Sequence, residues 1–125
     1  MRKWLIGAGI QGAMAVGFGA WAAHGAEQVL EPHAIDWVKT GSSYQLWHAI
    51  ALLGIAALAT RFPSRRLALA GLAFCFGALA FSCSLYGLAL GGPFWLVYVT
   101  PFGGSLLILG WIAVLAAGFG NLPAR

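Results

Sequence analysis

Charged side chains are scarce in this chain of 125 residues. Lysine, arginine, aspartate and glutamate together make up 8% of the residues, whereas an ordinary soluble domain has about 25%. Hydrophobic residues make up 61%, so polar groups are too few to cover the exterior of a soluble protein of this size. The shortage of charge argues against a soluble domain and indicates a protein whose solvent is apolar, the lipid bilayer.

Acidic residues are scarcer than basic ones, and the net charge is +4. No basic stretch with interleaved aromatic residues accompanies this charge, so the sequence predicts no nucleic-acid partner. Cysteine is also rare: Cys75 and Cys83 lie in one apolar run. On a helix they would be about 12 Å apart along the axis, beyond the roughly 7 Å Cα limit of a disulfide. We expect two free thiols.

Four long segments without charge run through the chain, at residues 4–23, 44–60, 67–90 and 101–119. A helix needs about 20 apolar residues to cross about 30 Å of hydrocarbon. The connections between the segments are short, which favours antiparallel neighbours. The sequence therefore predicts an all-α, integral membrane, antiparallel four-helix bundle that forms a single transmembrane domain over residues 1–125.

Two helix starts are marked by proline. Pro32 follows an acidic residue, and we expect a short amphipathic helix on the outer surface over residues 32–40, either separate or continuing into the second span. Thr100 and Pro101 are expected to be the N-cap and first residue of the fourth helix.

Most basic residues fall on one side of the predicted spans: Arg2, Lys3, Arg61, Arg65, Arg66 and Arg125. The other side carries all three acidic residues and Lys39. By the positive-inside rule both termini are predicted to face the cytoplasm. A cleaved signal peptide ending near Ala22 is the alternative for the first span. Its apolar run of twenty residues exceeds the about 7–15 of a signal sequence, so we expect it to remain.

Residues 5–12 read LIGAGIQG, in which Gly7, Gly9 and Gly12 match the dinucleotide-binding pattern G-x-G-x-x-G. That pattern requires a preceding strand within a βαβ unit, and only MRKWLI precedes it here. The sequence therefore predicts a helix and no dinucleotide partner.

Small residues recur at helical spacing in three spans and are expected to let helix backbones approach closely. The predicted packing positions are Gly9, Ala13, Gly17, Gly71, Ala78, Gly103, Gly104 and Gly110. Gln11 lies opposite the first of these stripes, so we expect it to face lipid or another subunit.

Uncharged polar residues and histidine gather toward the outer ends of the spans: His24, Tyr44, Gln45, His48, Ser82, Ser84, Tyr86 and Thr100. One interpretation is hydrogen bonding between helices near the interface. The other is a functional site, either a proton or small-solute pathway opening outward or a metal or haem site involving His24 and His48. No spacing matches a known ligand motif, so the sequence predicts no metal and no cofactor. It also contains no catalytic motif.

Four blocks of sequence carry a family resemblance: GAWAAHG (19–25), YQLWHAIALL (44–53), FSCSLYGLAL (81–90), and TPFGG with a later GW (100–104 and 110–111). With them the chain resembles the YgdD/YwdK-like family of small four-helix membrane proteins, a domain of unknown function with a small mammalian transmembrane relative. Cys83 stands where the family commonly has glycine. The resemblance implies a bacterial inner-membrane location and supplies no activity.

The leading functional hypothesis is a non-enzymatic structural or accessory component of the inner membrane. Besides the lipid bilayer, its expected partners are further copies of itself or a larger membrane complex, reached through helix–helix association. The alternatives are the outward-opening pathway and the outer-interface metal or haem site.

Overall fold

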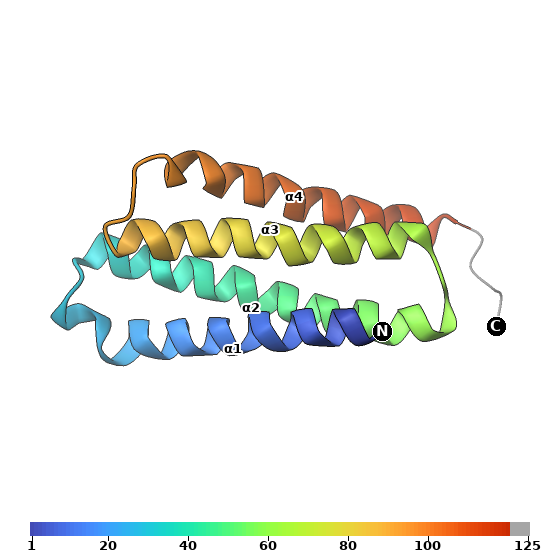
Figure 1. The fold of residues 1–125 in the computed structure, drawn as a ribbon, viewed down its shortest axis with the longest axis horizontal. Helices are drawn as coiled ribbons and strands as arrows, with labels where there is room; N and C mark the ends of the chain where they lie inside the picture. The colour runs from blue at the N-terminus through green and yellow to red at the C-terminus, as the bar shows by residue number, and fades with distance from the viewer. Residues whose placement is uncertain (121–125) are drawn as a thin grey trace.

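The computed structural model describes residues 1–120, so Arg125 lies outside the described residues. Its helices are α1 (Arg2–His24), the short 3₁₀ helix η1 (Ala26–Gln28), α2 (Pro32–Arg61), α3 (Arg65–Ala89) and α4 (Leu96–Gly118). The four α-helices are each long and apolar enough to cross a membrane. They run side by side in alternating directions (Figure 1). The predicted antiparallel membrane bundle is confirmed.

The second span begins well before its apolar segment. Pro32 is the first residue of α2, which runs for 30 residues without a break. Residues 32–40 are therefore the first turns of α2 and not a separate helix. Gly41, where a break could fall, packs tightly: a Cβ there would lie 2.9 Å from the ring of Tyr86. Contact with α3 keeps α2 continuous across this glycine.

The predicted start of the fourth helix at Thr100 and Pro101 is wrong. The helix begins at Leu96, and Pro101 lies inside it. The backbone is already turning before Leu96, since the Leu96 and Val97 amides donate to the carbonyls three residues earlier, at 3.1 and 3.0 Å. A proline inside a helix removes one hydrogen bond and crowds the carbonyl four residues earlier, and α4 nevertheless continues through Pro101 to Gly118.

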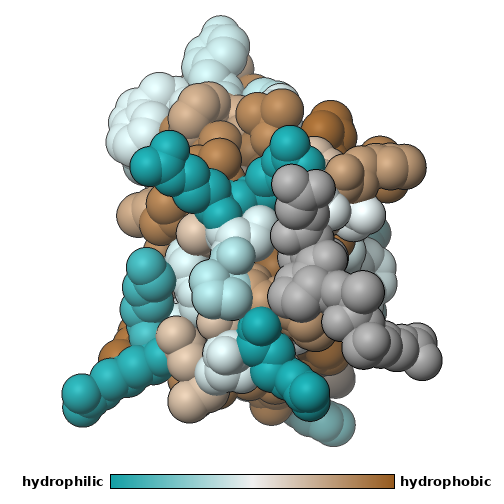
Figure 2. Space-filling view, turned by 90° about the vertical axis from the view of Figure 1, so that its right-hand side faces the viewer, coloured by the Kyte–Doolittle hydropathy of each residue, from teal (hydrophilic) through white to brown (hydrophobic). Residues whose placement is uncertain are grey.

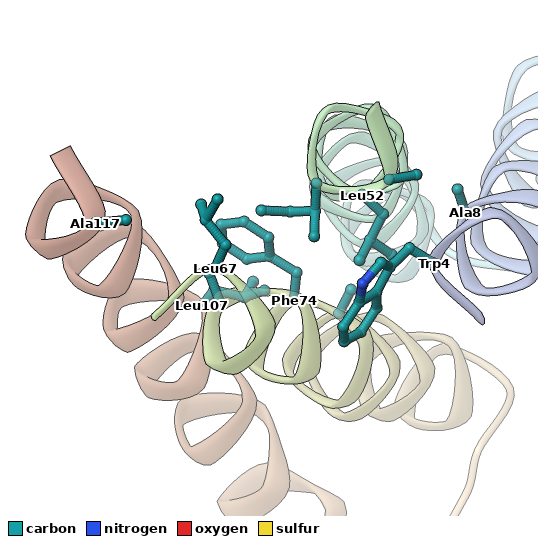
Figure 3. Packing of buried hydrophobic residues seen from close by; sticks show 11 residues of the cluster. Trp4, Ala8, Leu52, Leu67, Phe74, Leu107 and Ala117 are labelled. Atoms are coloured by element: carbon teal, nitrogen blue, oxygen red, sulfur yellow. The ribbon is translucent and has the colours of Figure 1, made fainter. Parts of the chain in front are cut away.

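The helices are not arranged as a closed square. α2 and α3 form a central pair; α1 lies mainly against α2, and α4 packs its backbone against α3 alone, as Figures 1 and 3 show. The large side chains of the core come from all four helices: Trp4, Leu52, Ile55, Leu67, Phe74 and Leu107. The corner between α2 and α4 is left open.

The first helix packs through a different face from the one predicted. Gly9, Ala13 and Gly17 are exposed, and no atom lies within 4 Å of a Cβ built on either glycine. The buried residues of α1 are Trp4, Ala8, Gln11, Ala15 and Ala22. The prediction that the Gly9 stripe faces the bundle is therefore wrong, and so is the prediction that Gln11 faces outward.

Glycine brings the other helices close together. A Cβ on Gly71 would lie 2.7 Å from the Trp4 ring, and one on Gly110 would lie 2.6 Å from the ring of Phe74. A Cβ on Gly103 would overlap the backbone nitrogen of Phe81 and lie 2.8 Å from its Cα. Ala78 is fully buried nearby. Gly104 is less crowded, with the Phe81 ring 3.6 Å away.

Candidate functional site

A chain of side-chain hydrogen bonds joins α1, α2 and α3 in the middle of the bundle. The Gln11 amide donates to the carbonyl oxygen of Cys75 at 2.9 Å. The Gln45 amide donates to Gln11 Oε1, and the Tyr86 hydroxyl donates to Gln45 Oε1, both at 2.7 Å. Phe18 stacks on the Tyr86 ring with centroids 3.9 Å apart. Gln45 is thus the link between three helices.

Serine hydroxyls add further bonds between neighbouring helices. Ser42 donates to the Ala15 carbonyl and Ser82 donates to the Gly41 carbonyl, each at 2.7 Å. The hydroxyls of Ser84 and Thr100 lie 2.6 Å apart. These bonds join α2 to α1, α3 to α2, and α3 to α4 respectively.

This polar network is closed. Gln45 and Ser82 have no exposed surface, and Gln11, Ser84 and Tyr86 are nearly as buried. Among residues 1–120, every buried side-chain nitrogen or oxygen has a hydrogen-bond partner. A pathway would require a water-accessible cavity lined by these groups, and within one described chain they pack against one another instead. This packing gives no support to a pathway through Ser82 and Tyr86 within one chain, and the outward-opening pathway stays a hypothesis.

His48 makes the bridge between α2 and α4. The indole N–H of Trp111 donates to His48 Nε2 at 3.0 Å, and an indole nitrogen can only donate. The neutral imidazole therefore carries its proton on Nδ1, which donates to the Tyr44 carbonyl at 2.6 Å. Both ring nitrogens are occupied, so His48 holds the Trp111 ring across the open corner.

Trp111 divides that corner into two chambers, which together form the α2–α4 groove. The chamber nearer the start of α2, named the outer chamber, has a volume of ≈ 400 Å³. The chamber nearer the end of α2, named the inner chamber, has a volume of ≈ 230 Å³. The outer chamber is lined by Tyr44, His48, Phe81, Pro101, Gly104, Ser105, Leu107, Ile108 and Trp111. The inner chamber is lined by Ala51, Gly54, Ile55, Leu58, Leu67, Phe74, Trp111 and Val114. No charged side chain lines either chamber.

The remaining members of the predicted polar layer lie apart from the network. His24 is exposed at the end of α1. The Tyr44 ring is partly exposed and packs 4.8 Å from Phe81, centroid to centroid. Among the described residues, no group of three or more histidine, cysteine, aspartate or glutamate side chains could hold a metal ion. The structure thus pairs Gln45 with Tyr86 on one side of α3 and Ser84 with Thr100 on the side that faces α4. It leaves His24 apart from His48.

Charge is separated along the bundle. Arg2 and Lys3 begin α1, Arg61 ends α2 and Arg65 begins α3, so these side chains share one end (Figure 2). Glu27, Glu31 and Asp36 lie in η1, the turn after it and the start of α2, at the opposite end. Arg66 Nη1 donates to the Ala116 carbonyl at 2.6 Å, across the basic end of α3 and α4.

The comparisons with known proteins agree with this architecture. The family described as "Protein of unknown function (DUF423)" matches residues 18–104. The chain belongs to this family. It is similar to a UPF0382 membrane protein of Haemophilus influenzae, with 38% identity over 94% of each chain. The UPF0382 inner membrane protein YgdD of Escherichia coli is 35% identical over 91% of this chain and 87% of its own.

A third relative has a similar identity and coverage. A UPF0382 membrane protein of Staphylococcus epidermidis is 37% identical over 94% of this chain and 95% of its own. No solved structure matches the chain. The predicted resemblance to the YgdD-like family is confirmed.

Sequence reasoning missed three residues of the site: Gln11, Ser42 and Trp111. Gln11 was placed on the wrong face, although an interior glutamine in a membrane helix usually indicates a helix contact. Ser42 lies before the predicted apolar segment. Trp111 is 63 positions from His48, and no local pattern connects the two.

Proposed function

We propose that this DUF423 protein is a non-enzymatic accessory component of the bacterial inner membrane that acts by self-association through the outward face of α1. A relative of similar length is named an inner membrane protein. The buried polar side chains are engaged in bonds that hold the helices together, so they support a structural role. Between the charged ends, the exposed surface of the spans carries many large hydrophobic side chains.

One observation carries the proposal. Gly9 and Gly17 are glycines with open space around them, and Ala13 between them is exposed. Glycine inside a helix destabilises it by about 0.5–1 kcal/mol relative to alanine. Gly7, Gly19 and Gly71 offset this cost by contact with a neighbouring helix, whereas Gly9 and Gly17 have no such contact with the described residues 1–120. Close approach of a second helix gives these two glycines a role.

The shape of the same face supports the proposal. Met14, Gly17, Phe18 and Trp21 surround a shallow hollow of ≈ 230 Å³. Small residues at Gly9, Ala13 and Gly17 have the spacing with which membrane helices cross closely. A second copy presents the same small residues and the same hollow, so a two-fold contact buries both. We therefore propose a dimer in which two α1 helices cross.

Self-association is tested by measuring the mass of the purified protein in mild detergent by native mass spectrometry over a range of concentrations. In the variant Gly9→Leu/Gly17→Leu, we expect the dimer dissociation constant to rise at least about tenfold, equivalent to about 1.4 kcal/mol. The matched control is Ala57→Leu, because Ala57 is exposed but lies on α2 and lines neither the hollow nor the α2–α4 groove. A wild-type protein that is monomeric throughout, or a control with the same effect, overturns the proposal.

We also propose that both termini face the cytoplasm. The support is the basic end formed by the starts of α1 and α3 and the end of α2, because cytoplasmic loops carry an excess of lysine and arginine. A reporter enzyme active only outside the cytoplasm, fused after residue 120, should be inactive. The same reporter fused between η1 and α2 should be active.

A further inference from the structure

The inner chamber of the α2–α4 groove is lined by hydrocarbon except for the Trp111 indole, whose N–H is bonded to His48. Its walls come from α2, α3 and α4. Toward the bilayer centre it ends at Trp111, which the hydrogen bond to His48 holds in place. Gly54 forms part of the wall, and no atom lies within 4 Å of a Cβ built there. The inner chamber is thus an apolar slot, and Trp111 closes its end nearest the bilayer centre.

Arginines lie at the other end of this slot. Leu58 lines the slot three residues before Arg61, and Leu67 lines it two residues after Arg65. Arg61, Arg65 and Arg66 are all exposed. Arg66 uses one N–H on the Ala116 carbonyl, and a guanidinium has five donors. The three acidic residues of the chain lie at the opposite end of the bundle.

We propose that the inner chamber and its arginines bind one anionic phospholipid of the leaflet at the basic end. The acyl chain lies in the slot below Trp111, and the phosphate contacts Arg61 and Arg65. Uncharged walls accept hydrocarbon and exclude an ionic occupant, since an unpaired charge there loses its hydration. Guanidinium groups pair with phosphate oxygens through two parallel hydrogen bonds. The two halves of the site therefore select the two halves of one molecule.

The depth of the slot matches one leaflet. Ala51 and Arg61 are ten residues apart on α2, which is about 15 Å of helix rise. Half of the roughly 30 Å hydrocarbon core is also about 15 Å. A chain whose headgroup lies at Arg61 therefore reaches Ala51, where Trp111 closes the slot.

The proposal is tested with purified protein in a neutral detergent, titrated with phosphatidylglycerol or phosphatidylcholine and followed by native mass spectrometry. Neutral detergent removes the charged bilayer surface that attracts any basic protein. Wild type should retain one phosphatidylglycerol in preference to phosphatidylcholine. Arg61→Gln/Arg65→Gln should weaken phosphatidylglycerol at least about tenfold, the effect of losing about 1.4 kcal/mol of charged hydrogen bonding.

A matched pair of variants separates this site from general attraction to the basic end. Arg2→Gln/Lys3→Gln removes the same charge from the same end, but α1 does not line the slot. This pair should change retention less than about twofold, well below the tenfold effect of one charged hydrogen bond. Equal loss in both pairs, or no preference for phosphatidylglycerol in wild type, overturns the proposal.

The acyl half of the site is tested by filling the slot. Gly54→Leu places a side chain inside it and should weaken phosphatidylglycerol by a similar factor while all arginines remain. Ala23→Leu is the control, because Ala23 is exposed on α1 and lines neither the slot nor the hollow of the proposed dimer face. Where thermal unfolding shows that Gly54→Leu is not folded, Ala51→Leu replaces it. Undiminished binding in a folded variant with a filled slot overturns the proposal.

Discussion

The two sides of the central α2–α3 pair are joined to their neighbours by different means. On one side, α1 is tied by buried glutamines whose bonds continue to Tyr86 on α3. On the other side, α4 lies against α3 through close contact of Gly103 with the backbone at Phe81 and of Gly110 with the Phe74 ring. Lipid removes the hydrophobic drive between helices, so hydrogen bonds and close packing are what remain.

The two kinds of contact leave different amounts of space between the helices. A hydrogen-bond network needs side chains that meet in the interior, and it closes α1, α2 and α3 around Gln45. Close packing at glycine needs only two backbones, and α4 therefore leaves α2 at a distance. The α2–α4 groove is the result, and within residues 1–120 the side-chain hydrogen bond that crosses it is the one from Trp111 to His48. The side that carries α1 buries its polar side chains, and the side that carries α4 leaves a groove between α2 and α4.

The largest expected loss of stability comes from disrupting the close contact between α3 and α4. Gly103→Leu places its Cβ against the backbone of Phe81, 2.8 Å from Cα, and backbone cannot move aside as a side chain can. We expect a loss of at least about 3 kcal/mol in unfolding free energy, the upper part of the range for overpacking, measured by denaturation in detergent. Gly104→Ala is the control, because its Cβ would make an ordinary 3.6 Å contact. Equal tolerance of both variants would show that α4 is not held by close approach.

The second-largest expected loss of stability comes from disrupting the hydrogen bonds that join α1, α2 and α3. Gln45→Leu leaves Gln11 Oε1 and the Tyr86 hydroxyl buried without their partner. Each buried unsatisfied group costs about 1–3 kcal/mol, so two groups cost about 2–6 kcal/mol. Because hydrogen bonds between membrane helices contribute little on average, about 0.6 kcal/mol, we expect a loss in the lower part of that range, about 2–3 kcal/mol, in the same assay. The triple variant Gln11→Leu/Gln45→Leu/Tyr86→Phe removes all the partners together and should recover most of the stability. A triple variant less stable than Gln45→Leu contradicts the network.

A third measurement sharpens the comparison where the two sides meet. His48→Phe and Trp111→Phe, alone and combined, form a double-mutant cycle across the groove. We expect a coupling of about 0.6–1.7 kcal/mol, the range found for hydrogen bonds between membrane helices. The unfolding free energies of the four proteins give the value. Strict additivity would mean that His48 does not hold Trp111 across the groove.

The smallest effect concerns the polar contact between α3 and α4. Ser84→Ala removes the partner 2.6 Å from the Thr100 hydroxyl, but Thr100 keeps the Leu96 carbonyl at 3.3 Å. We expect a loss of about 0.6 kcal/mol or less in unfolding free energy. A loss as large as that of Gln45→Leu would show that hydrogen bonds, and not glycine packing, hold α4.

The spans and the composition of the polar layer could be predicted because both depend on transfer from water to lipid. Residues such as Gln45, Ser82 and Tyr86 were named from their depth, and they do meet. The packing face of α1 could not be predicted in the same way. Lipid and protein interior are equally apolar, so Gly9 and Gly7 look alike in the sequence, although only Gly7 contacts α3.

The predicted start of the fourth helix is wrong because the local sequence and the packing against α3 favour different boundaries. Thr100 and Pro101 form a good helix start by themselves, yet α4 begins at Leu96. In the folded chain the Thr100 hydroxyl lies beside Ser84 on α3 instead of capping a helix. A cap is a local preference of about 1 kcal/mol, and packing against another helix can outweigh it.

The sequence by itself determined that this chain is apolar enough for four membrane-crossing helices, with basic residues at one end and acidic ones at the other. Hydropathy and charge act residue by residue, so they can be read without a fold. Only the tertiary structure decided which face of α1 is buried, that Gln45 links three helices, and that a groove remains between α2 and α4. These depend on backbones distant in sequence approaching within a few ångströms, which no local pattern specifies.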